Sequence, residues 1–219
     1  MANVVTEICK KELRSRFGSK SVFLSMLLTT GIPMLVFIPQ LLEAMSQAEP
    51  GSEYLSFLLF LVIPVMATTL VGINTFINEI RWKTIKFLLV APVSEEEIFI
   101  GKSLACIIVG LLVDVILSLI VLLSLDRLDI SVILLLFVIG PLSVIFTTFI
   151  FIIGTSRFPI IAEGVGAIIR PMGGLLFVFL NYLFLKEFLK VSPSLINVVL
   201  ALIIASLTCL TYFIAKKKL

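Results

Sequence analysis

Six apolar stretches, each about as long as a membrane-spanning helix, constrain this chain more than any other feature. A helix needs about 20 mostly apolar residues to cross roughly 30 Å of hydrocarbon. Only 14% of the 219 residues are charged and 60% are hydrophobic, whereas soluble domains average about 25% and about 45–50%. The sequence predicts an all-α integral membrane protein with one transmembrane domain over 1–219 and spans at 21–42, 54–78, 103–125, 130–154, 159–181 and 195–215.

Basic residues alternate between the two ends of these spans. They concentrate before the first span, between the second and third, between the fourth and fifth, and at the C-terminus: Lys10, Lys11, Arg14, Arg16, Lys20, Arg81, Lys83, Lys86, Lys102, Arg157, Lys216, Lys217 and Lys218. The intervening loops contain fewer. Because loops rich in Lys and Arg stay in the cytoplasm, both termini and residues 77–103 are predicted to be cytoplasmic.

The fifth span is the least regular. It contains Glu163, Arg170, Pro171 and the pair Gly173–Gly174, which is compatible with a broken helix. Residues 182–192 then form either a loop or a re-entrant segment that turns back into the outer leaflet. Irregular backbone at that depth has to be covered by protein or face a water-filled cavity.

Residues 4–17 are predicted to form a basic amphipathic helix in the cytoplasmic interface. One face is apolar and the opposite face is polar: Val5, Ile8, Cys9, Leu13 and Phe17 against Glu7, Lys10, Lys11 and Arg14. Glu12 and Arg16 fall on the apolar face and do not fit the pattern. The helix is either a topological anchor or a lever that links the first span to something on the cytoplasmic side.

The charged stretch between the second and third spans reads as a helix, a break and a new helix. Pro92 ends the first helix because its ring removes a backbone donor and restricts Ala91. Ser94 with Glu97 three residues later has the spacing of a capping box, so a capped helix should run through Gly101 and Lys102 into the third span. The apolar face of 79–90 must contact either lipid or another protein, and physics alone favours neither.

Several kinds of chemistry are excluded or unsupported. The chain has no histidine, and Cys9, Cys106 and Cys209 show no CxxC spacing. The Gly-Lys-Ser run at 101–103 ends like a phosphate-binding loop, but the required first glycine falls on Glu96 and no strand precedes it. We therefore predict no catalytic residue, metal site or nucleotide site, and no nucleic-acid partner.

The run from Glu79 to Lys102 resembles the cytoplasmic loop of type-2 ABC transporter permeases, the membrane subunits of many prokaryotic exporters. That loop typically reads E-[RK]-x-x-G-T-[LI]-x-x-L-L-x-x-P-[VL]-S-x-x-[ED]-[IL]-x-x-G-K. The matching residues are Glu79, Thr84, Ile85, Leu88, Leu89, Pro92, Val93, Ser94, Glu97, Ile98, Gly101 and Lys102. The family's glycine before the threonine is Lys83 here, and the acid often found after the T-[LI] pair is Lys86, which leaves the partner's docking chemistry open.

The resemblance implies a permease subunit that performs no chemistry itself and lies in the cytoplasmic membrane of a prokaryote. Residues 79–98 would be a coupling region docked on a separate ATPase, with ATP and magnesium bound by that partner. Two permease subunits, as a homodimer or heterodimer, would pair with two ATPase subunits. The coupling residues would be Glu79, Trp82, Thr84, Ile85, Leu88, Leu89, Pro92, Gly101 and Lys102. The cargo stays open among lipid-like, drug-like, peptide, ion and haem substrates.

Four polar residues inside the spans are candidates for the transport pathway: Asp114, Glu163, Arg170 and Asn181. A carboxylate in mid-membrane is costly, so Asp114 should face protein or water. It is either a pathway or proton-linked group or one half of a structural pair. Glu163 with Arg170 is also explained by a charge pair at the cytoplasmic end, and Asn181 by a hydrogen bond between helices.

Two other functions are compatible with the sequence. A stand-alone secondary transporter commonly shows internal repeats and broken helices near the midplane, and no convincing repeat relates the two halves of this chain. A membrane scaffold or immunity protein would bind a partner without moving a substrate.

Overall fold

The computed structural model describes residues 2–18, 20, 24, 36, 39, 43, 60–69, 94–124, 130–157, 165–188 and 192–216. Every regular element in these ranges is a helix. The elements are α1 (Ala2–Phe17), an unlabelled helix Phe60–Thr69, α7 (Glu95–Ser124), α8 (Ile130–Leu134), the π-helix η3 (Leu135–Ile139), α9 (Gly140–Arg157), α10 (Val165–Leu183), the π-helix η4 (Phe184–Phe188) and α11 (Pro193–Lys216).

Three of these helices are long and apolar enough to cross a membrane: Glu96–Leu123, Val132–Ile153 and Leu195–Ile214. They coincide with the third, fourth and sixth predicted spans, as expected of a multi-pass membrane protein. Phe60–Thr69 and Gly173–Lys186 are shorter apolar helices within or beside the second and fifth predicted spans. Most of the first two spans lies outside the described residues, so the total of six spans stays a prediction.

The fifth predicted span is not broken where its sequence suggested a break. α10 runs continuously from Val165 to Leu183 through Pro171 and both glycines, and η4 continues the helix to Phe188. Gly174 has a packing role instead, because a Cβ placed there would lie 2.9 Å from Cδ1 of Ile150 on α9. Small residues at helix contacts let backbones approach closely inside membranes. Residues 189–191 of the expected loop or re-entrant segment lie outside the described part.

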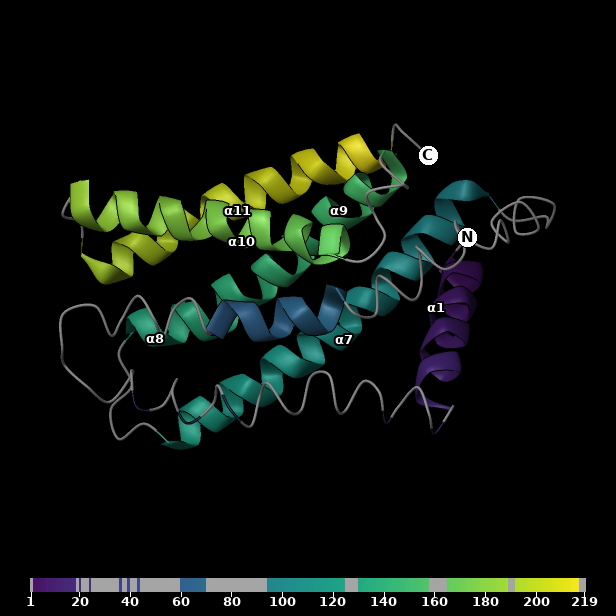
Figure 1. Cartoon of the computed structure of the whole chain (residues 1–219), viewed down its shortest axis with the longest axis horizontal. Coiled ribbons are helices and arrows are strands. Elements are labelled where there is room, and N and C mark those ends of the chain that lie inside the picture. Colours follow the sequence, from purple (N-terminus) through teal and green to yellow (C-terminus); the bar gives the residue numbers. More distant parts are fainter. Residues whose placement is uncertain are drawn as a thin grey trace.

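The four long helices α7, α9, α10 and α11 run in alternating directions (Figure 1). α1 lies across the first turns of α7. The end of α9 and the C-terminal end of α11 lie at that same end of the molecule, on the right in Figure 1. α1, the start of α7, the end of α9 and the end of α11 therefore lie at one end of the molecule, and which side of a membrane this end faces stays a prediction.

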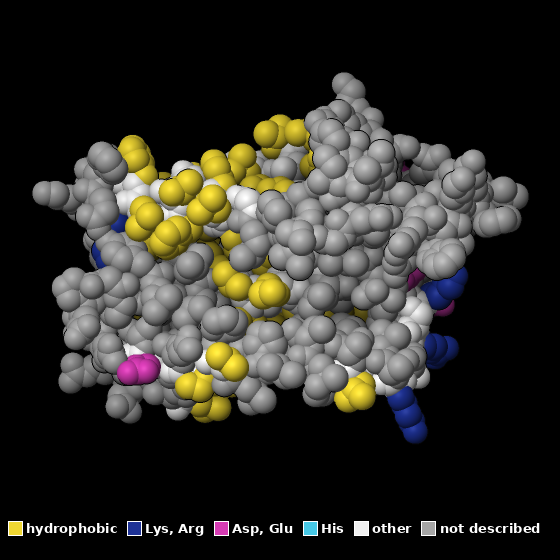
Figure 2. Space-filling model, viewed as in Figure 1, with side chains coloured by type: hydrophobic (Ala, Val, Ile, Leu, Met, Phe, Trp, Pro, Cys, Tyr) yellow, Lys and Arg dark blue, Asp and Glu magenta, His cyan; other side chains and the backbone are white. Residues whose placement is uncertain are grey.

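The core is built where α7, α9, α10 and α11 meet the helix Phe60–Thr69. Its fully buried members include Phe60, Leu117, Leu136, Ile196 and Leu200. A second cluster joins Phe99 of α7 to Phe149, Phe151 and Ile152 of α9. Apolar side chains that face outward are frequent on α7, α10 and α11, and Figure 2 shows several patches of them on one face, with basic side chains at the end where α1 lies and a few at the opposite end. Outward apolar faces are what a lipid-exposed bundle requires.

Candidate functional site

The first turn of α7 carries the capping box that the sequence predicted. The backbone N–H of Ser94 donates to Oε2 of Glu97 at 3.0 Å, and the N–H of Glu97 donates to Oγ of Ser94 at 3.3 Å. The Ser94 hydroxyl also donates to Oε2 of Glu97 at 2.8 Å. These bonds use backbone donors that have no partner inside a helix. The cap at Ser94 therefore fixes the residue at which α7 begins.

α1 packs closely against α7 at Gly101. A Cβ on Gly101 would lie 2.8 Å from both Cβ and Cγ2 of Ile8, and 3.1 Å from the carbonyl oxygen of Val5. No side chain larger than hydrogen fits without moving α1 or Ile8. The glycine of the Gly-Lys pair at 101–102 is thus explained by a helix–helix contact.

Lys102 and Glu12 form an ion pair inside this contact. Nζ of Lys102 donates to Oε1 of Glu12 at 2.8 Å, and the two side chains are only 4% and 12% exposed. Glu12 is one of the two residues that did not fit the apolar face of the predicted helix. Its position on that face is explained by Lys102, which lies ninety residues later in the chain. A buried pair of this kind strongly penalises loss of either partner.

Most of α1 agrees with the predicted amphipathic pattern, although Phe17 of the predicted apolar face is 42% exposed. Cys9 is buried and Ile8 and Leu13 are half-buried, whereas Lys10, Lys11 and Arg14 are exposed. Burial, with a smaller contribution from the charge of Glu12, raises the pKa of the Cys9 thiol above its usual value of 9.0. At least part of the apolar face of α1 therefore lies on protein.

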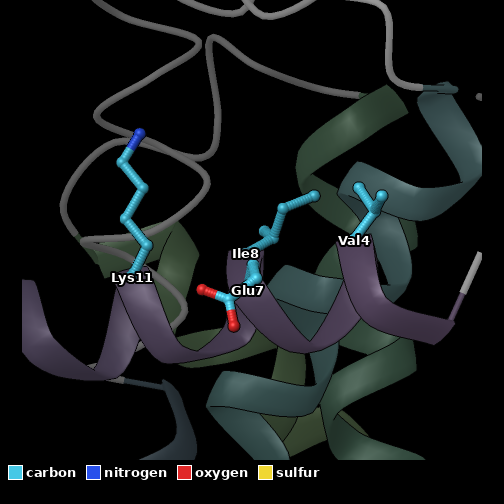
Figure 3. Close-up of a pocket in the computed structure, with 4 residues that line it drawn as sticks. All are labelled: Val4, Glu7, Ile8 and Lys11. Atoms are coloured by element: carbon cyan, nitrogen blue, oxygen red, sulfur yellow. The ribbon is translucent and has the colours of Figure 1, made fainter.

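A shallow open hollow of about 450 Å³ lies beside α1 and is lined by Val4, Glu7, Ile8 and Lys11 (Figure 3). Val4, Ile8 and Lys11 point to the same side of the helix in Figure 3, as expected for residues spaced three and four apart. The hollow presents one cation and one carboxylate and contains no group of three metal-ligating side chains. It shows no preference for an anionic or a cationic ligand.

Farther along α7, a seam with α9 brings three pairs of positions together. Gly110 meets Val144 and also Thr68 of the helix Phe60–Thr69, Asp114 meets Gly140, and Ser118 meets Leu136. Each step of four residues along α7 matches a step of four residues backwards along α9 and η3. This is the register of two antiparallel helices in contact over several turns.

Asp114 is the charged residue at the centre of this seam. Its carboxylate is fully buried, and Oδ1 would lie 2.5 Å from a Cβ on Gly140. Neither carboxylate oxygen has a hydrogen-bond partner among the described residues, nor does Oγ of Ser143 one turn along α9. The seam adjoins η3, and short π-helical segments inside α-helices are frequent at functional sites. The sequence predicted that Asp114 would face protein or water, and in the structure its side chain is buried against protein.

The other predicted site residues are distributed differently. Gly101 and Lys102 lie at the α1–α7 contact. Asn181 is half-buried on α10, and its Nδ2 donates to the carbonyl oxygen of Phe177 at 2.8 Å, so this bond runs within its own helix rather than between helices. Arg170 belongs to α10. The remaining predicted residues lie outside the described part of the chain: Glu79, Trp82, Thr84, Ile85, Leu88, Leu89, Pro92 and Glu163.

Sequence reasoning did not identify Gly110, Gly140, Ser143 or Glu12 as members of a site. Glu12 gave a signal, because it was an acid on an apolar helical face. Gly140 and Ser143 gave none, since their importance depends on which turn of α9 lies against Asp114. Comparison of the chain with protein-family models, curated proteins and solved structures finds no match.

Proposed function

We propose that this chain is the permease subunit of an ATP-driven exporter, energised by a separate cytoplasmic ATPase that docks on the 79–94 stretch. The observation that supports this most directly is the junction of α1 with the first turns of α7. A partner that moves the 79–94 stretch needs rigid elements to move with it, and the Ser94 cap, the Gly101 contact and the Glu12–Lys102 pair supply them.

In this proposal the junction makes α1 and the start of α7 one mechanical unit. A displacement of the capped N-terminus of α7 moves α1 as well, because separating them breaks a buried ion pair. The ATPase can move this unit only through contacts that differ between the conformational states of the ATPase. In this proposal Lys102 binds α1 and does not contact the ATPase. The residues that contact the ATPase are Trp82, Ile85, Leu88 and Leu89.

The cargo that best suits this chain is apolar or amphipathic. Outward and inward faces of the long helices are dominated by aliphatic and aromatic side chains, and the described spans contain few charges. A pathway between two such subunits would be mostly apolar, which suits lipid-like, peptide or drug-like molecules.

A tagged full-length chain, isolated in mild detergent from its native membrane, tests the docking claim by mass spectrometry of its partners. An ATPase subunit should co-isolate with the wild type and be lost in Trp82→Glu and Leu88→Asp, since interface anchors of this kind each contribute about 2 kcal/mol or more. Arg14→Gln, an exposed change on α1, is the matched control and should keep the partner. Intact ATPase association in both docking variants overturns the docking claim.

A stand-alone proton-linked transporter is the second candidate, and the buried Asp114 favours it. In proteoliposomes that contain the chain alone, this candidate requires uptake driven by a pH gradient without any ATPase. The permease proposal requires no uptake under these conditions.

A further inference from the structure

The carboxyl group of Asp114 is enclosed by three helices. Its Oδ1 lies against the backbone at Gly140, and Cε1 of Phe60 approaches the same point, 3.0 Å from where a Gly140 Cβ would be. The side chain is 0% exposed, and both of its oxygens are without a hydrogen-bond partner in the described structure. A buried carboxylate without a partner is an unfavourable arrangement that calls for an explanation.

No charged group on the helices that contact Asp114 in the described structure offsets a negative charge there. The helix Phe60–Thr69, α8, η3 and the first three turns of α9 contain no titratable side chain. On α7 itself the nearest charged side chain is that of Lys102, twelve residues away, or about 18 Å along the helix, and it already pairs with Glu12. Arg157 lies at the far end of α9. An ionised Asp114 would therefore be desolvated and would have no compensating charge among the described residues around it.

The neighbouring hydroxyl groups are engaged elsewhere, with one exception. Thr68 donates to the carbonyl oxygen of Pro64 at 2.9 Å, Thr147 to that of Ser143 at 2.6 Å, and Ser118 to that of Leu136 at 3.5 Å. Ser143 has no partner for its Oγ among the described residues. One hydroxyl is enough to bond a neutral carboxylic acid, but it is too few to solvate a carboxylate.

We propose that Asp114 is a proton-binding site, occupied and neutral in this packed arrangement, and that release of its proton requires α7 and α9 to separate at Gly140. Ser143 is the positioning residue that hydrogen-bonds the neutral acid after a small side-chain rotation. The proton is preferred to a metal cation because it needs no shell of several oxygen ligands, and the close contact at Gly140 leaves little room for an ion. This inference does not depend on the proposed ATPase partner.

The pH dependence of stability has a defined sign. In the unfolded chain an aspartate ionises near its ordinary pKa of about 3.9, whereas the packed state retains the proton. The unfolded state therefore binds fewer protons, and stability falls as pH rises. Asp114→Asn mimics the neutral acid and removes this dependence. The difference in thermal midpoint between the variant and the wild type isolates Asp114 from every other titrating group.

Purified full-length protein in detergent should show similar midpoints for wild type and Asp114→Asn at or below about pH 4, and a variant that becomes progressively more stable than the wild type as the pH rises to about 8. A variant that is less stable than the wild type by the same margin at every pH would mean that the carboxylate is charged in the folded state, and would overturn the proposal. Asp114→Leu has no ionisable group at this position. Any loss of stability in this variant that is the same at every pH therefore reports packing, whereas a difference from the wild type that changes with pH reports ionisation of Asp114.

Infrared difference spectroscopy gives a second readout that packing alone does not move. The wild type should show a carboxylic acid C=O band at neutral pH that is absent in Asp114→Asn, shifted in Ser143→Ala, and unchanged in the exposed control Glu7→Gln. Replacing sodium by N-methylglucamine at constant pH should leave the band and the midpoints unchanged. Absence of the band, or its dependence on sodium, would contradict the proposal.

Discussion

Lys102 Nζ lies 2.8 Å from Glu12 Oε1, and this buried contact joins the first helix of the chain to the first turns of α7. The pair lies immediately beside Gly101, where Ile8 approaches closely. Together the two contacts hold α1 against the helix that follows the charged stretch 79–94.

Replacing one member of the Glu12–Lys102 pair should destabilise the protein strongly. Glu12→Gln or Lys102→Met leaves the other charge buried without its partner, and such losses cost about 3–5 kcal/mol. The double variant should lose less than the sum of the single variants, which a double-mutant cycle of denaturation measures. The exposed pair Lys10–Glu7 is the internal control, since Lys10→Gln should change stability by about 1 kcal/mol or less. Additive single effects would show that the pair is not coupled.

Two glycines in helices should respond oppositely to alanine. Gly101→Ala places a Cβ 2.8 Å from Ile8 and should destabilise the α1–α7 contact, with partial rescue by Ile8→Ala. Gly173→Ala meets nothing within 4 Å and should be neutral or stabilising by up to about 1 kcal/mol, because alanine favours the helix. Thermal midpoints of the three variants check both expectations. Equal effects at Gly101 and Gly173 would exclude a close contact at Gly101.

Cys9 should react slowly with thiol reagents while α1 is docked. Burial and the charge of Glu12 raise the pKa of the Cys9 thiol, so its reactive thiolate forms at a higher pH than that of an ordinary cysteine. In a chain with Cys106 and Cys209 replaced by alanine, alkylation at about pH 8 should be at least about tenfold slower than in denaturant. Glu12→Gln should accelerate it, because it removes one cause of the raised pKa and loosens α1. The control Glu7→Gln should leave the rate unchanged; an equal acceleration there would contradict this explanation.

Removing the N-cap of α7 should have a small and local effect. Ser94→Ala loses the bonds to the Glu97 amide and carboxylate and should cost about 1 kcal/mol. Hydrogen exchange of the first α7 amides is expected to rise, while exchange around Leu117 stays unchanged. A uniform increase in hydrogen exchange along the whole of α7 would instead indicate that the variant loses global stability, which would contradict a local effect.

Features encoded by neighbouring residues could be predicted from the sequence. The Ser94–Glu97 box, the amphipathic α1 and the three long apolar helices each depend on a local pattern. Pro171 with Gly173–Gly174 left a broken helix open, and α10 is continuous there, because the pattern does not show that Gly174 is used for contact with Ile150 of α9. The residues that Glu12 and Asp114 contact lie on other helices, and no local pattern sets which turns of two helices meet.

ATP hydrolysis by the isolated complex tests the central claim most directly. A full-length chain purified with its partners should carry ATPase activity that is lost with Trp82→Glu. With Glu12→Gln the ATPase should still co-purify with the chain, but its rate of ATP hydrolysis should no longer differ from that of the ATPase without the membrane subunit. Preparations without ATPase activity, or activity that Trp82→Glu leaves unchanged, would contradict a motor docked on the 79–94 stretch.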